Sequence, residues 1–237
     1  MAKAADLSAG WVERPMLGIY LTNLWASLPF FLKGLWMTVQ VAGISLVLST
    51  VGGFVLGILS AQRLRGFKWL VAAYVDVIRG TPFLVQIFIV FFILPEWGIH
   101  LEAFASAVLG LTIYGTAYIC EIVQGALRAI PPGQVEAAAA CGLRWWQQMR
   151  HVVVPQALRP ILPPLVGQYV LLIKDTAVVS VIGLTDVTRV GWLTVQRIPN
   201  GIIVFGLVGL LYFLICYPLV YLSNRLETRL KVDRSLL

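Results

Sequence analysis

The sequence has few charged residues. Of its 237 residues, 12% are Asp, Glu, Lys or Arg, whereas 59% are hydrophobic. A soluble domain usually carries about 25% charged residues, so this chain has too few of them to cover the surface of a water-soluble protein. The composition therefore favours a protein that spans a lipid bilayer.

The sequence also lacks the usual signatures of catalytic, metal and nucleotide sites. Cys120, Cys141 and Cys216 follow no CxxC spacing, and we interpret them as free thiols packed among small and apolar residues. His100 and His151 have no Ser, Cys or carboxylate partner at a spacing typical of catalysis or metal binding. No GxxxxGK[ST] segment is present to hold nucleotide phosphates. We therefore expect no catalytic residue, no metal site and no cofactor bound by this chain itself.

The net charge of +7 does not indicate a nucleic-acid partner, because the positive residues are scattered between apolar runs. Their distribution predicts an orientation in a membrane instead. In a five-span arrangement, eleven Lys and Arg residues fall on one face and five on the other. We expect the richer face to be cytoplasmic, which places the N-terminus outside and the C-terminus inside. The N-terminal residues show no removable signal peptide, so the apolar spans themselves would direct insertion.

Long uncharged runs predict an all-α integral membrane protein with about five transmembrane helices. A crossing needs about 20 apolar residues. Residues 34–62 and 198–224 are long enough, and residues 103–120 are nearly so. Residues 69–95 and 160–183 are expected to form two further crossings, each interrupted by polar groups.

The N-terminal region is harder to assign. Residues 15–32 are uncharged, but Lys33 alone would separate them from the next helix, which leaves no room for a turn. We interpret residues 1–33 as an extracytoplasmic, amphipathic segment on the membrane surface, with a sixth span as the alternative. Residues 34–237 would then form the transmembrane domain.

The connection over residues 131–155 is longer than a simple link between two helices requires. A Pro-Pro-Gly sequence breaks the preceding helix, residues 134–141 form an Ala-rich helix, and Gly142 offers a left-handed cap. A second helix is expected over residues 143–154, ending at Pro155. The predicted result is a helix, a tight turn and another helix on the cytoplasmic side.

This connection carries a family resemblance. Glu136-Ala137-Ala138, followed by Gly142 and Pro155, resembles the EAA loop of permease subunits in bacterial ATP-binding-cassette (ABC) importers. In this chain Val152 and Val154 replace the Ile and Leu of the family pattern, which is a conservative departure.

Two further motifs agree with this resemblance. Residues 79–86, with the sequence RGTPFLVQ, are similar to a segment typical of the polar amino acid subgroup. A Lys-Asp-Thr motif at residues 174–176 and a Val-Ile-Gly-Leu motif at residues 181–184 form the third match. The similarity runs from about residue 34 to the C-terminus.

The resemblance implies the permease fold of type I ABC importers, with a cytoplasmic EAA coupling loop at about residues 131–155. It implies a second permease subunit, identical or related, two ATPase subunits that bind ATP and Mg²⁺, and an extracytoplasmic binding protein for amino acids. The location would be the bacterial inner membrane, and the chain itself would not be an enzyme. We expect the ATPase-docking residues to be Glu136, Ala137, Ala138, Gly142, Arg144, Trp145 and Pro155.

Polar residues at membrane depth are candidates for the substrate pathway. Gly80 permits a bend, Thr81 can cap the helix that follows, and Pro82 suits its first turn. Freed backbone groups at such a break can satisfy polar ligands. The candidate pathway residues are Thr81, Pro82, Gln86, Tyr114, Glu121, Lys174, Asp175 and Thr176.

Several of these residues have a structural alternative. Lys174 and Asp175 lie about 100° apart on a helix, so each is expected to meet a different partner, as substrate ligands or as members of structural ion pairs. Glu121 fits a structural or gating role better than a ligand role. Asp76 and Arg79, at i and i+3, are expected to pair with each other.

We conclude from the sequence that the protein is the permease subunit of an ATP-driven, binding-protein-dependent importer of polar amino acids that works by alternating access. The alternative is an ion-coupled secondary transporter in which Glu121, Lys174 and Asp175 relay protons or ions. A membrane-embedded enzyme is a third class, but we find no clustered set of catalytic groups.

Overall fold

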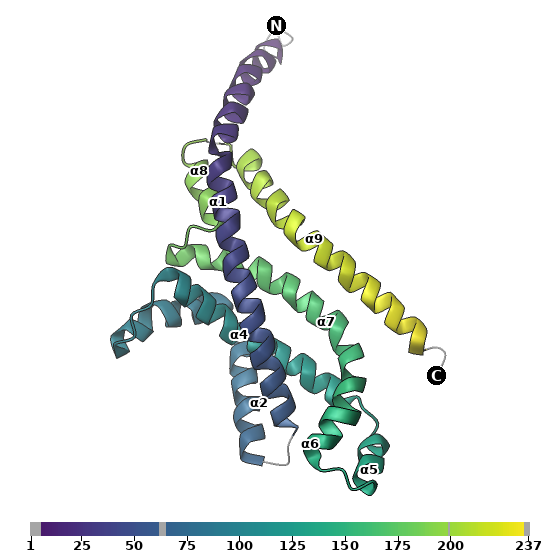
Figure 1. Cartoon of the computed structure of the whole chain (residues 1–237). Coiled ribbons are helices and arrows are strands. Elements are labelled where there is room, and N and C mark those ends of the chain that lie inside the picture. The colour runs from purple at the N-terminus through teal and green to yellow at the C-terminus, as the bar shows by residue number, and fades with distance from the viewer. Residues whose placement is uncertain (1–5, 62–64, 199, 235–237) are drawn as a thin grey trace.

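The computed structural model describes residues 6–61, 65–198 and 200–234, and all secondary structure in these residues is helical (Figure 1). The α-helices are α1 (Asp6–Ser60), α2 (Arg65–Gly80), α3 (Phe83–Phe88), α4 (Ala103–Arg128), α5 (Pro132–Ala140), α6 (Trp145–Gln148), α7 (Val154–Asp175), α8 (Val187–Val195) and α9 (Gly201–Arg234). Tighter or wider turns extend them: η1 (Ile89–Ile93) and η3 (Met149–Val153) are π-helical, and η2 (Leu94–Trp97) and η4 (Thr176–Ile182) are 3₁₀-helical.

Among the described residues, four helical stretches are long and apolar enough to cross a bilayer. They are Tyr20–Ser60, Ala103–Arg128, Trp145–Ile182 and Gly201–Arg229. A fifth crossing is possible if the bent pair Gly66–Gly80 and Phe83–Trp97 counts as one broken span. The prediction of an all-α membrane protein with about five spans is confirmed.

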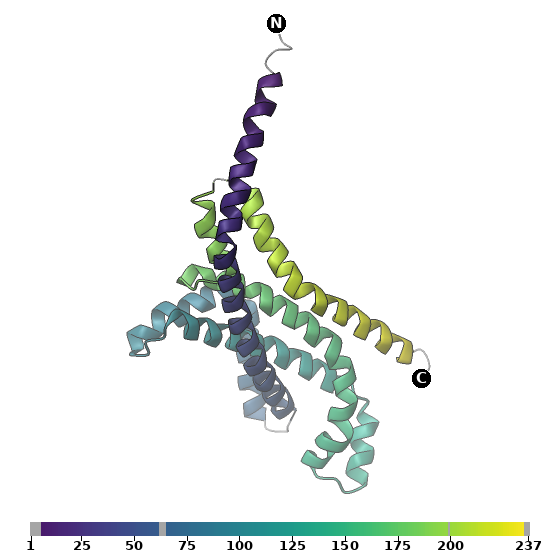
Figure 2. The same ribbon diagram turned by 45° about the horizontal axis from the view of Figure 1, so that its top comes forward.

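Helix α1 continues without a break through Lys33, so the chain has no turn between the N-terminal segment and the first predicted span. Phe31 is fully buried in a cluster with residues of α8 and α9, and Tyr20 and Leu24 pack on the same cluster. Figure 2 shows the first turns of α1 projecting beyond the other helices. Residues 20–33 therefore continue the helix of the first predicted span and pack on the α8–α9 end of the molecule.

Small residues bring α1 and α4 into close contact. A Cβ atom added at Gly53 would lie 2.6 Å from the Cβ of Ile119, and one added at Gly57 would lie 2.6 Å from Cγ1 of Val123. Neither distance is possible for a real side chain, so only Gly permits this approach. We call this contact the α1–α4 seam; it consists of Gly52, Gly53 and Gly57 of α1 and Thr116, Ile119 and Val123 of α4.

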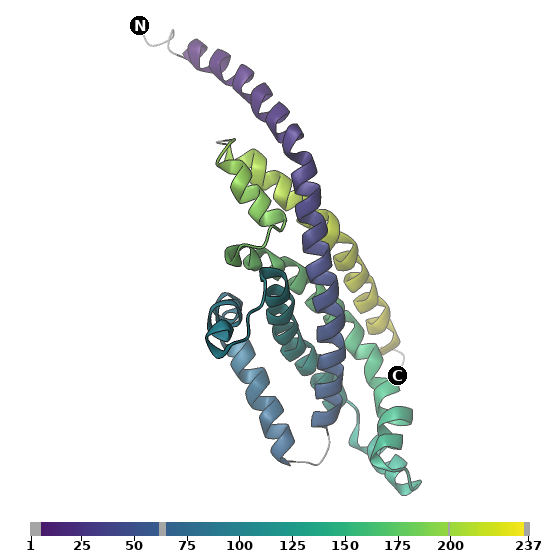
Figure 3. The ribbon, with the colours of Figure 1, turned by 60° about the vertical axis from the view of Figure 1, so that its left-hand side comes forward.

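The remaining spans pack around this seam. Helix α7 contacts both α4 and α9, and Thr50 of α1 shares a 2.8 Å hydrogen bond with the Tyr169 hydroxyl of α7. Helices α1 and α9 meet near α8 and diverge toward their other ends (Figures 1 and 3). Helix α8 was not predicted from the sequence. It fits between α1 and α9 because Gly34 and Gly191 leave space for their neighbours.

The prediction that the second loop helix ends at Pro155 was wrong. Pro155 lies in the first turn of α7, and α6, η3 and α7 follow one another without interruption. Proline has no N–H and clashes with the preceding turn of an α-helix. Here the wider π-turn lets the Val154 N–H donate to the Met149 carbonyl, which accommodates the proline without ending the helix.

One of the three cysteines departs from its interpretation. Cys120 and Cys216 are buried, as expected for thiols that pack as small apolar side chains, but Cys141 is exposed. Cys141 follows the last residue of α5, a short helix that buries only Ala138, so no neighbouring element covers the thiol.

Candidate functional site

Helix α5 ends in a well-defined turn. Gly142 has a φ of 77°, in the left-handed region that was predicted for it. Its N–H donates to the Ala139 carbonyl at 2.9 Å, and the Leu143 N–H donates to the Ala138 carbonyl at 3.2 Å. This pair of bonds is a Schellman motif, which satisfies the last carbonyls of α5 and fixes the direction in which the chain leaves the helix.

Most of α5 is exposed. Ala138 is the only buried residue of α5, and α5 packs on η3, where Met149 and Val153 are buried. Glu136 and Ala137 are exposed. Glu136 makes no hydrogen bond or ion pair with any part of the chain that the structure describes. We call residues 131–148 the α5–α6 segment; Figures 1 and 3 show it projecting away from the membrane-spanning helices.

The second half of this segment carries aromatic side chains. Trp145 and Trp146 meet edge to face with ring centroids 4.5 Å apart, and Trp146 is 59% exposed. The backbone N–H of Arg144 donates to the Gln147 side chain at 2.8 Å, which fixes the start of α6. The Arg144 side chain is itself exposed. An exposed Trp beside an exposed Arg is typical of protein interfaces.

The second candidate region is the break between α2 and α3, where the axis bends by 105°. The predicted break is therefore present, but Thr81 does not cap α3. The Thr81 hydroxyl donates back to the Val77 carbonyl at 2.9 Å, and the N-cap of α3 is Pro82. Threonine in a last helical turn can bond the carbonyl four residues earlier, and here that bond prevails over capping.

Gln86 stabilises the break. Its Nε2 donates to the Ile78 carbonyl at 2.7 Å, to the Thr81 carbonyl at 3.1 Å and to the Thr81 hydroxyl at 2.9 Å. These contacts satisfy carbonyls that the end of α2 leaves without helical partners. The Gln86 Oε1 is buried and has no partner among the described residues. The Gln86 amide nitrogen thus stabilises the bend, and the amide oxygen remains free to accept a hydrogen bond.

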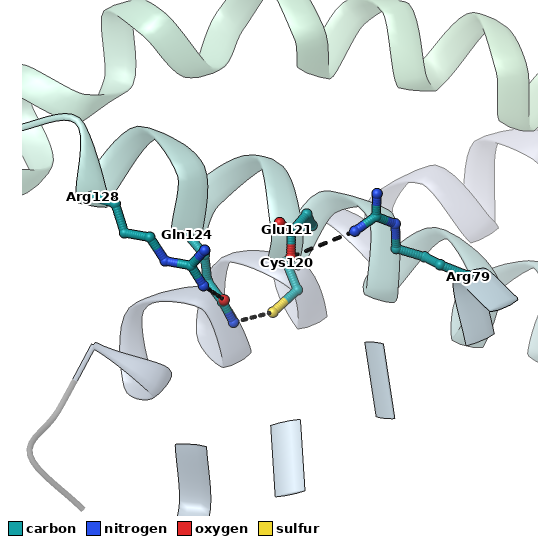
Figure 4. Close-up of polar contacts among 5 residues, drawn as sticks. All are labelled: Arg79, Cys120, Glu121, Gln124 and Arg128. Atoms are coloured by element: carbon teal, nitrogen blue, oxygen red, sulfur yellow. Dashed lines mark hydrogen bonds and ion pairs between the residues drawn. The ribbon is translucent and has the colours of Figure 1, made fainter. Parts of the chain in front are cut away.

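Arg79 pairs with Glu121 of α4 rather than with Asp76. Nη1 of Arg79 lies 3.6 Å from Oε2 of Glu121 (Figure 4). The Arg79 guanidinium also lies 5.6 Å from the centre of the Tyr118 ring. The expected Asp76–Arg79 pair was wrong, because α2 packs across α4 and offers Arg79 a carboxylate and an aromatic face on another helix. Both charged side chains are about 40% exposed.

Aromatic rings continue this surface along α4. Tyr114 lies 4.9 Å from the Phe83 ring and 4.7 Å from the Tyr118 ring, measured between centroids. The Tyr114 hydroxyl also interacts with the carboxyl group of Asp175 at the end of α7. The structure thus brings together three predicted pathway residues, Tyr114, Glu121 and Asp175. Arg79 and Tyr118, which were not predicted as pathway residues, lie beside them. We call these five residues the α4 stripe: Arg79, Tyr114, Tyr118, Glu121 and Asp175.

Lys174 and Thr176 turn away from the α4 stripe. Lys174 is exposed and lies near Cys216 of α9, so Lys174 and Asp175 do meet different neighbours. Thr176 is fully buried, and its hydroxyl donates to the Ile173 carbonyl at 2.7 Å and lies 3.4 Å from the Tyr212 hydroxyl. Thr176 therefore belongs to a second polar cluster, which consists of Thr176, Asp186, Thr188 and Tyr212.

The centre of that second cluster is Asp186, which is not among the residues predicted from the sequence. Its carboxylate accepts from the N–H groups of Thr188 and Arg189 and from the Tyr212 hydroxyl, at 3.2, 2.9 and 3.3 Å. Asp186 is the N-cap of α8, and burial raises the pKa of its carboxyl group although these hydrogen bonds favour the charged form. The sequence did contain a signal, because Asp directly before a helix is a preferred N-cap.

The two candidate regions have different chemistry. The α4 stripe offers a cation, two carboxylates and two tyrosines, which suits a solute that bears both an ammonium and a carboxylate group. The α5–α6 segment offers an acidic, small-residue and Trp-rich surface, which suits a protein partner. Tyr114, Tyr118 and Glu121 follow one another at i, i+4 and i+7 within α4 and so share one helix face, a spacing that would have revealed Tyr118 from the sequence.

Comparison with known proteins gives concordant results. Residues 53–232 match the family described as "Binding-protein-dependent transport system inner membrane component". The chain is 38% identical to a probable glutamine ABC transporter permease protein of Bacillus subtilis over 85% of this chain and 94% of that one. It is 34% identical to the arginine transport system permease protein of B. subtilis, over 86% and 94% of the two chains. With the glutamine transport system permease protein of Escherichia coli K12 it shares 34% identity, over 88% and 96%.

Solved structures show the same similarity. A crystal structure of an amino acid ABC transporter with histidines matches with a TM-score of 0.80 and 30% identity, over 88% of this chain and 97% of that chain. An inward-facing structure of a methionine ABC transporter matches with a TM-score of 0.73 at 23% identity, over 86% and 97%, which supports the fold.

Proposed function

The chain belongs to the family of binding-protein-dependent transport system inner membrane components, and from this premise we propose that it couples ATP hydrolysis by partner subunits to amino acid import. It is an ABC importer permease for amino acids and not an enzyme. The sequence left an ion-coupled carrier as the alternative. We set it aside, because the relatives that align with this chain over most of their length are permease proteins of transport systems of the same family. Glutamine and arginine, named for the relatives, are the first substrates to test.

The α5–α6 segment is the proposed docking site for the ATPase. The observation that carries this proposal is an exposed helix whose acidic residue Glu136 has no partner in the described chain, followed by the exposed Trp146. A surface of this kind fits a groove in another protein, with the Trp as an anchor. The Schellman turn at Gly142 fixes the direction in which the chain leaves α5. Because α5 packs on η3 and η3 continues into α7, a displacement of α5 would be transmitted to α7.

The orientation in the proposal follows from the positive charges. The face that carries the α5–α6 segment holds the larger share of Lys and Arg residues, and such faces are cytoplasmic in multi-pass proteins. The N-terminus then lies outside and the C-terminus inside. The complex would contain a second permease subunit, two ATPase subunits that bind ATP and Mg²⁺, and an extracytoplasmic amino acid binding protein.

The α4 stripe is the proposed part of the substrate pathway. The carboxylates of Glu121 and Asp175 suit the substrate ammonium, and the guanidinium of Arg79 suits the substrate carboxylate. When the two ATPase subunits close, the two α5–α6 segments of the permease pair approach each other and α7 moves with them. Asp175 terminates α7, so this motion changes its distance from Tyr114 on α4. The stripe would thus open alternately to the two sides of the membrane.

Reconstitution tests the docking proposal. The permease is placed in liposomes with its ATPase and binding protein, and ATP hydrolysis is measured as a function of glutamine and arginine. Glu136→Ala is expected to lower both substrate-stimulated hydrolysis and copurification of the ATPase. The matched control is Glu96→Ala, which removes another exposed acidic side chain outside the α5–α6 segment. Equal losses for both variants would contradict docking at α5.

A second comparison tests the pathway. Asp175→Asn is expected to lower the maximal uptake rate and leave ATPase copurification unchanged. Asp186→Asn is the control, because Asp186 is a buried aspartate of the second cluster, away from the α4 stripe. Unchanged uptake by the Asp175→Asn protein would remove Asp175 from the pathway.

A further inference from the structure

A cavity of about 260 Å³ lies where the last turn of α1, the first turns of α2 and the end of α4 come together. Its polar lining is Ser60 of α1, Lys68 of α2, and Gln124 and Arg128 of α4. Two of these four residues are cations that come from different helices. None of the described residues that line the cavity is acidic.

The charge of Arg128 is held in place without being neutralised. Its Nη2 donates to Oε1 of Gln124 at 2.6 Å, and Nε2 of Gln124 contacts the Cys120 sulfur at 3.3 Å (Figure 4). Gln124 is a neutral acceptor, so the guanidinium keeps its full charge and most of its five donors. Glu121, the nearest acidic residue on α4, turns instead toward Arg79.

Lys68 faces the cavity from the other side. It is exposed, and it forms no ion pair with the part of the chain that the structure describes. Ser60 is buried, and its hydroxyl donates to the Gly57 carbonyl at 2.7 Å, so it has no O–H left to donate to an anion and the two cations are the ligands that remain. Two cations without a carboxylate between them form a site for an anion.

The next two residues of α2 indicate where such an anion comes from. Trp69 is 77% exposed and Leu70 is 72% exposed, directly after Lys68. An exposed Trp at the end of a span is typical of the zone where headgroups meet acyl chains. A free anion in water needs no apolar platform beside its site, whereas a phospholipid does. The cavity is also slightly smaller than the roughly 300 Å³ of the smallest drug-sized pockets, so it suits a headgroup phosphate rather than a whole small molecule.

We propose that this cavity binds the phosphate of an anionic phospholipid, with Arg128 and Lys68 as its two ligands and with Trp69 and Leu70 against the acyl chains. The C-terminal ends of α1 and α4 carry partial negative charge, which lowers the positive potential close to the helix ends. The phosphate would therefore lie at the tips of the Arg128 and Lys68 side chains, away from those helix ends. The bound lipid would join α1, α2 and α4 at one membrane surface. Its binding is independent of ATP and of the transported amino acid.

The test measures lipid binding by the purified full-length protein in a neutral detergent. Native mass spectrometry counts the phosphatidylglycerol molecules that remain bound, and a thermal unfolding curve records the stabilisation. Phosphatidylglycerol is expected to bind and to raise the unfolding temperature, whereas phosphatidylcholine and inorganic phosphate are not. The variant with both Lys68→Gln and Arg128→Gln is expected to bind phosphatidylglycerol about thirtyfold more weakly.

Two controls separate loss of the site from loss of the fold. Arg150→Gln removes an exposed positive charge outside the cavity and is expected to bind phosphatidylglycerol like the unaltered protein. Arg128→Lys keeps the charge and is expected to retain most of the binding, and Arg128→Gln alone serves as the test if the double variant does not fold. Equal binding by the double variant, or by Arg128→Gln alone if only that variant folds, would overturn the proposal. Equal stabilisation by inorganic phosphate would overturn the lipid as the source of the anion.

Discussion

The α1–α4 seam and the α5–α6 segment are built in opposite ways. At the seam, the α1 backbone lies so close to α4 that Gly53 and Gly57 have no space for a Cβ atom. In the α5–α6 segment, Glu136, Ala137 and Trp146 are exposed, and α5 buries only Ala138. The difference teaches which contacts the chain completes by itself. The seam is finished within one subunit, whereas the α5–α6 segment presents a surface that a partner protein can cover.

The largest expected effect comes from breaking the seam. Gly53→Ala places a Cβ atom 2.6 Å from two atoms of Ile119, which forces α1 and α4 apart. We expect the free energy of unfolding in detergent to fall by about 3 kcal/mol, the upper end of the usual cost of overpacking. Gly43→Ala is the matched control, since no atom lies within 4 Å of a Cβ there. Because Ala favours helix over Gly, Gly43→Ala should leave stability unchanged or raise it; similar losses for both variants would refute close packing at the seam.

The next largest effect is expected on ATPase binding by the α5–α6 segment, with the fold left intact. Trp146→Ala removes an exposed ring and should lower the affinity for the ATPase subunit by about 2 kcal/mol, with unchanged thermal unfolding of the isolated permease. Affinity is measured by titrating the reconstituted permease with the purified ATPase. Trp25→Ala, which alters an exposed Trp at the other end of the molecule, serves as the control. A loss of stability that matches the loss of affinity would mean that the segment is part of the permease core.

A smaller effect is expected at Asp186, which fixes α8 against α1. Asp186→Ala removes the N-cap of α8 and should lower the free energy of unfolding by about 1 kcal/mol. Asp186→Asn keeps an acceptor oxygen for the Thr188 and Arg189 N–H groups, so its loss should be smaller. Stability is measured by chemical denaturation in detergent, and equal losses for the two variants would contradict the capping role.

The pH dependence of stability gives an independent test of Asp186. Burial raises its pKa, so the folded state holds the proton more tightly than the unfolded state does. The stability contributed by this proton is complete below the ordinary Asp pKa of about 3.9 and is lost as the pH rises through the raised value. In Asp186→Asn, this part of the pH dependence should disappear. An unchanged profile would show that the carboxyl group titrates normally.

The smallest effect on stability is expected at the ion pair of the α4 stripe. Arg79 and Glu121 are 3.6 Å apart and about 40% exposed, and ion pairs of this kind contribute about 0.5 kcal/mol. Arg79→Gln should therefore change the unfolding temperature very little while it lowers amino acid uptake. A loss of stability comparable to that of Gly53→Ala would make the pair a structural element like the seam.

The sequence predicted those parts of the fold that depend on local signals. Uncharged runs located the spans at α1, α4 and α9, and the Pro-Pro-Gly break and Gly142 located α5 and its left-handed cap. Hydropathy and turn chemistry act over a few residues, so they can be read without knowing which helices meet.

The sequence did not predict features that depend on a distant partner. Arg79 pairs with Glu121 because α2 crosses α4, and nothing within α2 distinguishes that partner from Asp76. Thr81 bonds back to Val77 rather than forward, because Pro82 and not Thr81 occupies the N-cap position of α3. Pro155 was predicted to end a helix because the π-turn before it leaves no mark in the sequence. Such choices are decided by packing after the helices form.

The exposed Cys141 permits the most direct test of the claim that an ATPase acts on this permease through the α5–α6 segment. Cys120 and Cys216 are buried, so a membrane-impermeant maleimide should label Cys141 selectively. Labelling is measured in inside-out vesicles with and without bound ATPase, with Cys141→Ala as the blank. We predict labelling in vesicles stripped of the ATPase and protection when the ATPase is added back. Labelling from the outer face only, or equal labelling with the ATPase bound, would contradict the account.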